Sequence, residues 1–277
     1  MKILNINNPF NAPVYHEEIV SSTSDVSRSL AGEGKPHGTV ITADFQEAGR
    51  GRAARPWTSD PGKNLLFTVL LRYGDSSSIP KALTLRTGLA VSLAIEDLVP
   101  SLFNQVSVKW PNDIMIGDRK TAGILTEWDG TTAYIGVGVN VSQRDFPGEY
   151  KTKAGSIIQA FPDLGENTRF VLLEDILSRF YAEIETPGSD ASREARSWRE
   201  IWREHRREVW RDRWRERLEE RLYKRGETVS FLPGAADSGN AIEGTLSGLG
   251  PEGELLIIPV GEEKERAYTS GELLVYQ

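Results

Sequence analysis

The 277-residue sequence has no cysteine, and this absence excludes several kinds of chemistry at once. Disulfide bonds, thiolate nucleophiles and zinc sites with sulfur ligands all need cysteine side chains. Histidine is scarce too, because His16, His37 and His205 are scattered and do not give the spacing of metal ligands. The sequence therefore predicts neither a disulfide-stabilised fold nor a histidine metal cluster.

Long apolar runs are also absent. No stretch approaches the roughly 20 consecutive apolar residues that a membrane-spanning helix needs. Residues 1–6 lack the apolar core and the small-residue cleavage site of a secretory signal. We therefore expect a cytoplasmic protein that has no membrane partner. Its content of 39% hydrophobic and 26% charged residues is ordinary for a globular chain.

Charge is unevenly distributed along the chain. The net charge is −7, yet residues 193–225 hold 13 basic and 8 acidic side chains and four of the seven tryptophans. An acidic body argues against a general nucleic-acid binder. The basic segment could bind nucleic acid through Arg and Trp, but its interleaved acids favour a solvated structural helix. Its apolar residues fall on two opposite faces, which are Trp198, Ile201, Trp202 and Val209 on one and Trp210, Trp214, Leu218 and Leu222 on the other.

Hydrophobic periodicity predicts short strands and two long helices before this segment. Strands are expected at 1–6, 14–20, 39–43, 65–72, 106–110, 113–116, 120–128 and 131–141. Helices are expected at 80–98 and 168–185, and a third begins after the polar run 21–25. Residues 146–167 read as a loop. Short strands at 227–232, 241–247, 254–260 and 273–276, separated by Pro and Gly turns, suggest a small β-barrel.

One loop stands out between two of these strands, with the sequence Gly-Arg-Gly-Arg-Ala-Ala-Arg-Pro-Trp at residues 49–57. Glycine allows the backbone to approach a ligand closely, and the forked guanidinium of arginine suits phosphate or carboxylate. A loop of this kind is often only solvated surface. Together with the motifs below, it predicts an anion-binding loop that becomes ordered when its ligand arrives.

Four other motifs carry polar groups or glycines at positions where a sheet would usually be apolar. They are Ser-Thr-Ser at 22–24, Val-Lys-Trp-Pro-Asn-Asp at 108–113, Lys-Thr-Ala-Gly-Ile-Leu-Thr-Glu at 120–127 and Gly-Val-Gly-Val-Asn at 136–140. Simple helix capping would explain the first, and a sheet-edge surface position would explain Lys109. Gly136 and Gly138 lie inside a strand, where glycine marks either a bulge or the close approach of a ligand.

In this order and spacing, the motifs resemble the biotin protein ligase family, in its monofunctional type without an N-terminal DNA-binding domain. The resemblance is sharp from about residue 21 to 140 and more diffuse to the end of the chain. It implies an α+β fold, in which a mixed β-sheet catalytic domain of the class II synthetase-like type is flanked by helices. It also implies three parts: a biotin- and ATP-binding domain at 1–190, a connecting helix at 191–225 and an SH3-like β-barrel at 226–277.

The resemblance also assigns site residues. Those expected to bind biotin are Ser22, Thr23, Ser24, Gln46, Gly49, Arg50, Gly51, Arg52, Lys120 and Gly123. Those expected to bind ATP are Arg55, Trp57, Lys109, Asn112, Asp113 and Asn140. Lys120 and Arg52 are the expected catalytic residues, and Asp113 is the expected ligand of Mg²⁺.

The implied reaction has two steps, with biotin and ATP as substrates and Mg²⁺ as the metal. Biotin and ATP form biotinyl-5′-AMP, and the biotin is then transferred to a lysine of a biotin carboxyl carrier protein of acetyl-CoA carboxylase or a related carboxylase. A homodimer is left open by the sequence.

Two other readings compete with a biotin ligase. A lipoate-protein ligase would share the adenylate chemistry, but the Arg/Gly loop with its Trp and the C-terminal barrel disfavour it. A nucleic-acid-binding repressor is the second reading. Only about twenty residues precede Ser22, fewer than a helix-turn-helix module needs. We therefore expect no nucleic-acid partner.

Overall fold

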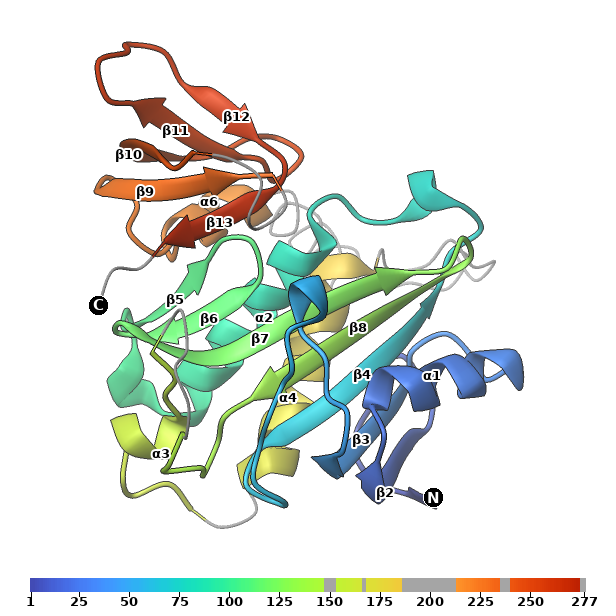
Figure 1. Ribbon diagram of the computed structural model, residues 1–277. Helices are drawn as coiled ribbons and strands as arrows, with labels where there is room; N and C mark the ends of the chain where they lie inside the picture. The colour runs from blue at the N-terminus through green and yellow to red at the C-terminus, as the bar shows by residue number, and fades with distance from the viewer. Residues whose placement is uncertain (147–152, 166–167, 186–212, 235–239, 275–277) are drawn as a thin grey trace, which may run out of the picture.

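The computed structural model describes residues 1–146, 153–165, 168–185, 213–234 and 240–274 (Figure 1). Its main feature is an eight-stranded sheet in the order β1-β2-β3-β4-β8-β7-β6-β5. Within it, β2 and β3 are parallel, and the other neighbouring strands are antiparallel. The strands are β1 (Lys2–Ile3), β2 (Val14–Val20), β3 (Thr39–Gln46), β4 (Leu65–Arg72), β5 (Val106–Lys109), β6 (Asp113–Ile116), β7 (Arg119–Trp128) and β8 (Thr132–Val139).

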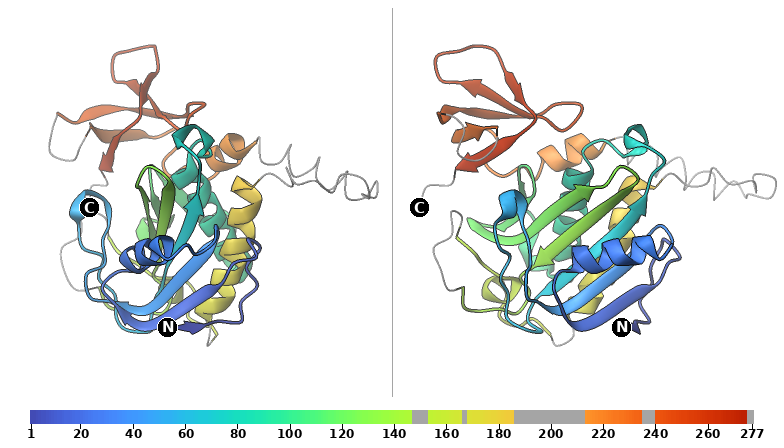
Figure 2. Two further views of the ribbon diagram at one scale, coloured as in Figure 1. Left: turned by 90° about the vertical axis from the view of Figure 1, so that its right-hand side faces the viewer. Right: turned by 45° about the vertical axis from the view of Figure 1, so that its right-hand side comes forward.

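Helices cover the sheet on both faces. Helix α1 (Thr23–Gly32) lies on one face, whereas α2 (Leu83–Leu98) and α4 (Thr168–Ile184) pack against each other on the opposite face (Figures 1 and 2). The fold is therefore a mixed sheet flanked by helices, as predicted. Among the described helices, none is both long and apolar enough to cross a membrane.

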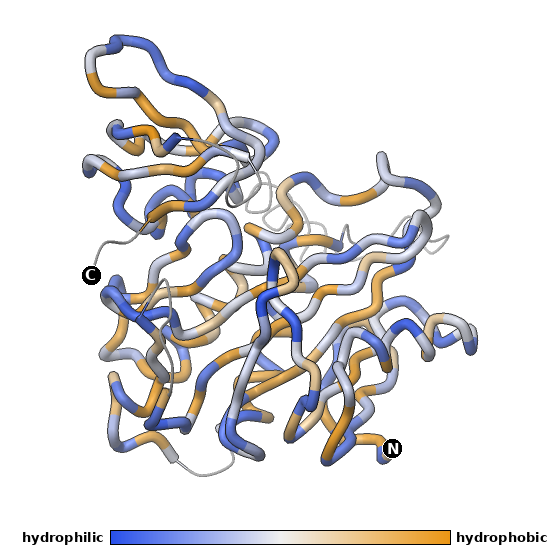
Figure 3. The backbone as a smooth tube through the Cα atoms, in the orientation of Figure 1, coloured by the Kyte–Doolittle hydropathy of each residue, from blue (hydrophilic) through white to orange (hydrophobic). Residues whose placement is uncertain are grey.

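The alternation of side chains along β8 decides where the core lies. Ala133, Ile135, Val137 and Val139 belong to the core that includes residues of α2 and α4. The intervening positions, Tyr134, Gly136 and Gly138, therefore face the side of the sheet that carries α1. Strand β4 is buried on both faces and is apolar almost throughout, which fits its central place (Figure 3). The face beside α1 thus has a stretch without side chains where two glycines occur.

A second, antiparallel sheet of five strands follows, in the order β12-β11-β10-β9-β13, consistent with an SH3-like domain. Its strands are β9 (Thr228–Pro233), β10 (Ile242–Leu249), β11 (Leu255–Pro259), β12 (Arg266–Tyr268) and β13 (Gly271–Leu274). Trp110 at the end of β5 contacts this sheet directly. Its indole Nε1 donates to the carbonyl of Gly253 at 3.0 Å, and its ring meets that of Phe231 edge-on at 5.9 Å. The two sheets are therefore in contact through a buried Trp.

Helix α6 (Trp214–Glu219) packs beside α2 and leads into the second sheet. Buried ion pairs hold this region: Arg217 to Glu183 at 2.6 Å, and Arg221 to Glu96 at 3.0 Å. The helix predicted over 191–225 falls largely on residues 186–212, which lie outside the described residues. In the described part the helix ends at Glu219, because the following backbone pairs with the edge of β5 instead.

Three smaller differences separate the sequence prediction from the structure. Helix α2 begins at Leu83 rather than at Pro80, because Ala82 at its start has a left-handed backbone with φ of 53°. A short helix, α3 (Ile157–Ala160), occurs within the stretch predicted to be a loop. Strand β12 was not predicted. It lies in a charged stretch without the pattern of a strand, and it forms a strand by pairing with β11.

Candidate active site

A cavity of about 640 Å³ opens on the α1 face of the main sheet. It lies between the Arg/Gly loop, the start of α1, strands β7 and β8, the turn after β5, and β13 of the second sheet. Its volume is within the range that small-molecule sites occupy. Fifteen of the sixteen candidate residues line it: Ser22, Thr23, Ser24, Gln46, Arg50, Gly51, Arg52, Arg55, Trp57, Lys109, Asn112, Asp113, Lys120, Gly123 and Asn140. The structure thus brings together motifs from the first half of the chain.

Glycines form the floor of the cavity, and the indole of Trp57 rests on them. A Cβ atom added to Gly138 would lie 2.6 Å from Cε2 of Trp57, and one added to Gly123 would lie 2.9 Å from its Cζ3. Real Cβ atoms essentially never come so close. The interpretation of Gly138 as a point where a ligand approaches stays a prediction, and the group that approaches it in this structure is the indole of Trp57.

The Arg/Gly loop is a tight hairpin that needs its first glycine. A Cβ on Gly49 would lie 2.6 Å from the carbonyl oxygen of Trp57. Instead, the Trp57 amide donates to the carbonyl of Gly49 at 2.9 Å, and the Gly51 amide donates to that of Arg55 at 2.7 Å. Gly49, the one candidate that does not line the cavity, therefore shapes the loop at its base.

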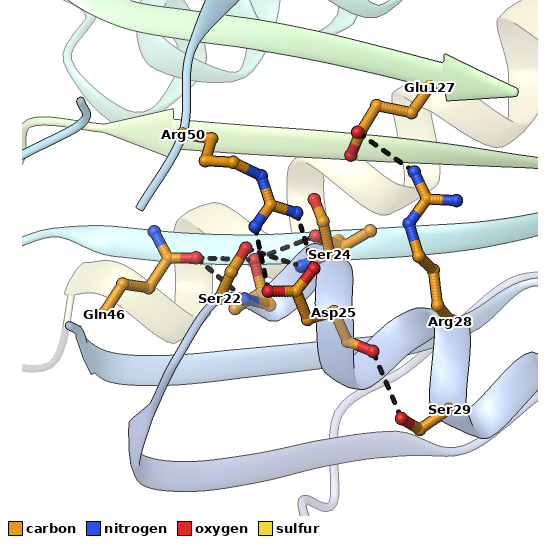
Figure 4. Close-up of polar contacts among 10 residues, drawn as sticks. Ser22, Ser24, Asp25, Arg28, Ser29, Gln46, Arg50 and Glu127 are labelled. Atoms are coloured by element: carbon orange, nitrogen blue, oxygen red, sulfur yellow. Dashed lines mark hydrogen bonds and ion pairs between the residues drawn. The ribbon is translucent and has the colours of Figure 1, made fainter. Parts of the chain in front are cut away.

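Arg50 is held outside the centre of the cavity by a carboxylate of α1. Its two guanidinium nitrogens donate to Asp25 at 2.9 and 2.6 Å (Figure 4). The hydrogen bond from Arg50 is the main reason that the pKa of Asp25 lies below its usual range. This bidentate pair fastens one side of the loop to the start of α1.

Arg52 and Arg55 reach the opposite side of the cavity. Arg52 donates to Oδ1 of Asn112 at 3.1 Å and to the carbonyl of Gly271 at 3.4 Å. Arg55 donates through both of its terminal nitrogens to the carboxylate of Glu272, at 3.0 and 2.7 Å. Two loop arginines are therefore bound to β13, which is more than 200 residues away in the sequence.

Lys120 projects into the cavity beside an irregularity in the sheet. Ile114 is paired with Ala122, but Met115 is paired with Lys120, so one extra residue bulges from β7. Bulges of this kind re-aim side chains. The Nζ atom of Lys120 lies 2.7 Å from Oδ1 of Asp113 and 5.7 Å from the centre of the Trp57 ring. The ammonium is thus placed among the loop, the sheet and a single carboxylate.

Lys109 is only 3% exposed, so its reading as a surface lysine at the sheet edge is wrong. Burial lowers the pKa of its ammonium, and the nearby carboxylates of Asp113 and Glu272 act in the opposite direction. A buried ammonium that lines a cavity is costly to keep charged unless anions surround it. Lys109 therefore lies at the same end of the site as Glu272 and Arg55, both of which act on it electrostatically.

The other end of the cavity offers neutral polar side chains beside the ion pair of Arg50 with Asp25 (Figure 4). Oε1 of Gln46 accepts from the amide of Thr23 at 2.8 Å and from its hydroxyl at 3.0 Å. The hydroxyl of Thr68 on β4 donates to that of Thr23 at 2.9 Å. The side chain of Ser22 caps α1 by accepting from the amide of Ser24. Helix capping and cavity lining therefore coexist in the Ser-Thr-Ser motif.

The family model and the relatives found by comparison with known proteins agree with one another. Residues 17–141 match the model of the biotin/lipoate A/B protein ligase family. The chain is 40% identical over 154 residues to the bifunctional ligase/repressor BirA of Bacillus subtilis. It is 33% identical over 149 residues to the biotin–[acetyl-CoA-carboxylase] ligase of Mycobacterium tuberculosis. Over residues 17–141 the chain is therefore similar in sequence to this family.

The match to these ligases is partial in sequence but nearly complete in fold. The first alignment includes 53% of this chain and 46% of the Bacillus protein, and the second includes 52% of this chain and 53% of the Mycobacterium protein. The chain thus spans about half the length of these curated relatives. The biotin protein ligase of Aquifex aeolicus, solved in complex with biotin and ATP, superposes with a TM-score of 0.70 at 27% identity. That superposition covers 94% of this chain and 97% of the Aquifex chain.

Residues that the sequence did not single out also line the cavity or support it. Gly271 and Glu272 come from β13, Phe146 and Ala154 come from the segment after β8, and Thr68 supports Thr23 from below. No local motif marks Glu272. It is one of many glutamates, and its place in the cavity depends on how the second sheet docks.

Asn140 and Asp113 have protein partners in this structure. The amide nitrogen of Asn140 donates to the carbonyl of Gly155 at 2.9 Å, which makes it a structural tie as well as a lining residue. Asp113 forms an ion pair with Lys120. Within the part of the chain that is described, no group of three His, Cys, Asp or Glu side chains is arranged to hold a metal. These residues suit a magnesium ion that arrives bound to phosphates and takes one carboxylate from the protein.

Proposed function

We propose that this protein is a biotin protein ligase, which activates biotin with ATP and transfers it to a lysine of a biotin carboxyl carrier protein. The observation that carries the proposal is the polarity of the cavity. One end offers neutral hydrogen-bonding groups around Thr23 and Gln46, and the other gathers Lys120 with two arginines of the loop, Arg52 and Arg55. The third loop arginine, Arg50, is paired with Asp25 beside the first end (Figure 4). A buried ureido ring needs neutral hydrogen-bond partners, whereas a carboxylate and a phosphate need fixed positive charge.

In the first step, an oxygen of the biotin carboxylate attacks the α-phosphorus of ATP. A carboxyl–phosphate bond forms, the bond to pyrophosphate breaks, and biotinyl-5′-AMP results. Two anions must meet, so the proposal gives Lys120 the role of neutralising both as its ammonium leaves Asp113. Arg52 and Arg55 hold the loop side of the phosphates, and Trp57 and Asn140 contact the nucleotide.

In the second step, the amine of the carrier lysine attacks the acyl carbon of biotinyl-5′-AMP. A carbon–nitrogen bond forms, the bond to AMP breaks, and the amine loses a proton. Before that step the anhydride has to be kept from water. The Arg/Gly loop, fastened to α1 through Arg50, is the element that can cover it.

Magnesium would be held by Asp113 together with the phosphates of the nucleotide. When bound, it would offset the charge that builds on the departing pyrophosphate. The proposal also divides the chain as the sequence suggested: a catalytic part at 1–190, a connecting segment at 191–225 and a small C-terminal domain at 226–277.

The Aquifex structure with biotin and ATP, and the ligases named for acetyl-CoA carboxylase, support these assignments. The matching family also includes lipoate ligases, so lipoate is the natural competitor in a test. The protein should be incubated with ATP, Mg²⁺ and a biotin carrier domain, with either biotin or lipoate. Mass spectrometry should then find one biotinyl group on one lysine. Attachment of lipoate alone would contradict the proposal.

Lys120→Ala tests the first step separately. Pyrophosphate release at saturating biotin and ATP should fall by at least about a hundredfold, because a fixed positive charge at the reacting anions is lost. Lys264→Ala removes an exposed lysine of the second sheet and should release pyrophosphate at the normal rate. Near-normal release by folded Lys120→Ala would remove Lys120 from the mechanism.

A further inference from the structure

The second sheet contributes a carboxylate to the cavity, and the strand geometry fixes where it points. In β13, Gly271 and Leu273 are buried, and Leu273 packs in the core. Glu272 between them therefore points to the other side, toward the main sheet. Its carboxylate is 18% exposed and receives the bidentate hydrogen bonds of Arg55, whose side chain is 43% exposed.

The position of Glu272 is set by the second sheet and not by Arg55. A Cβ on Gly271 would lie 2.3 Å from the ring of Phe231, so β13 presses against β9 more closely than any other residue would allow. The φ of Gly271 is 149°, and its carbonyl accepts from Arg52. The carboxylate is thus presented by a rigid strand, whereas Arg55 reaches it with a long side chain from a loop.

The charges that line the cavity are unbalanced toward positive. The lining cations are Arg50, Arg52, Arg55, Lys109 and Lys120, and the lining carboxylates are Asp113 and Glu272. Glu272 also acts electrostatically on Lys109 and Arg52. It therefore shares with Asp113, which acts more strongly on both groups, the role of offsetting the cations at this end of the cavity.

The pair between Arg50 and Asp25 provides a contrast. Arg50 lines the cavity, but its partner Asp25 does not. Glu272 does line it, and it holds the guanidinium of Arg55, which lines the cavity as well. A carboxylate and a phosphate present similar pairs of oxygens to an arginine fork. Glu272 thus occupies the position on Arg55 that a phosphate group would take.

We propose that Glu272 is an internal competitor for the triphosphate of ATP: it binds Arg55 when no nucleotide is present and gives it up when ATP enters. This inference rests on the proposed function, because it takes ATP as the ligand. Part of the binding free energy of ATP is then used to separate Arg55 from Glu272. The second sheet thereby sets the affinity for ATP and keeps the loop attached while the site is empty.

The test is Glu272→Gln, which keeps the size of the side chain and removes its charge. Binding of ATP with Mg²⁺, and separately of biotin, should be measured by calorimetry. The dissociation constant for ATP should fall by about two- to fivefold, the range expected when a partly exposed ion pair no longer has to be broken. The constant for biotin should not change. Glu272→Asp, which keeps the charge, should remain close to the unmodified protein.

Glu262→Gln is the matched control, because Glu262 forms an ion pair with Arg266 within the same sheet and away from the cavity. It makes the same charge change and should leave ATP binding unaltered. In an Arg55→Ala background, Glu272→Gln should lose most of its effect. A persistent effect there would refute direct competition at Arg55.

Unchanged or weaker ATP binding by folded Glu272→Gln would overturn the proposal, because Glu272 would then assist the nucleotide or only hold the sheets together. The two proposals fail in different ways. A protein that binds ATP but releases no pyrophosphate with biotin would refute the ligase function alone. A protein that binds no ATP would refute both.

Discussion

Gly138→Ala is the most direct test of the cavity floor. The added Cβ would lie 2.6 Å from Cε2, 2.7 Å from Cζ2 and 3.0 Å from Nε1 of Trp57. Strand β8 cannot retreat, because β4 and β7 pair with it along its length. Trp57 sits on a loop and is partly exposed, so the indole has to lift away from the floor.

The expected cost in stability is small, and the expected effect on binding is larger. Overpacking a rigid core costs about 1–3 kcal/mol, but a loop side chain can relieve the clash by moving. Alanine also gains about 0.5–1 kcal/mol over glycine in a strand. The free energy of unfolding should therefore change by less than about 1 kcal/mol. If Trp57 stacks on adenine, a contact worth about 1–3 kcal/mol is disturbed, and ATP affinity should fall at least about fivefold.

The assay combines calorimetric ATP binding with tryptophan emission, and Trp57→Phe identifies the contribution of that indole. Gly136→Ala is the matched control on the same strand and face, since its Cβ would meet Ser24 Oγ at 3.3 Å and not Trp57. Gly138→Ala should shift the Trp57 emission to longer wavelength, whereas Gly136→Ala should not. Wild-type emission together with wild-type ATP affinity in Gly138→Ala would refute the described packing.

Two further predictions concern stability. Trp214→Ala should lower the free energy of unfolding by about 3–5 kcal/mol in chemical denaturation. The Trp214 side chain is 6% exposed, and the guanidinium carbon of Arg86 lies over its ring, 5.1 Å from the ring centre. A loss below about 1 kcal/mol, or salt-sensitive DNA binding by the intact protein, would contradict a structural role for this region. Asp129 has its pKa lowered to about 2, chiefly by the hydroxyl of Tyr134, so its stabilising effect is full above pH 4 and is lost as the pH falls toward 2. Asp129→Asn should therefore be less stable than the wild type by under about 1 kcal/mol at pH 7, because solvent screens this exposed group. At pH 2 the two proteins should be equally stable. A difference that persists at pH 2 would contradict the stabilising role given to the ionised Asp129.

The sequence predicted the main sheet well, because the residues of each strand carry the pattern that identifies it as a strand. Strand β4 was expected at residues 65–72 and occurs there, since an unbroken apolar run can be satisfied only in the centre of a sheet. The glycines of β8 were interpreted as a place where a ligand approaches closely, and this stays a prediction, since the group close to Gly138 here is the indole of Trp57. Local pattern was enough for β4, because its environment depends on its own residues and on the strands beside it.

The parts that the sequence missed depend on contacts between distant segments. Glu272 became a cavity residue only through the docking of the second sheet, and no neighbouring residue signals this. The sequence left open whether Lys109 is a surface residue, because the same alternating pattern fits an exposed edge strand and a strand that forms the buried wall of a site. The ion pairs of the loop arginines could not be predicted either, since each arginine had many carboxylates to choose from.

The contact of Trp110 with the second sheet has a consequence for how the molecule unfolds. The same residue follows β5, donates to Gly253, meets Phe231 and precedes Asn112 and Asp113 of the cavity wall. Neither sheet can separate without exposing this indole and releasing the segment that shapes the end of the cavity beside the second sheet. Loss of ligand binding and loss of the second sheet should therefore coincide on heating, and the two sheets should melt as one cooperative unit with a single calorimetric transition.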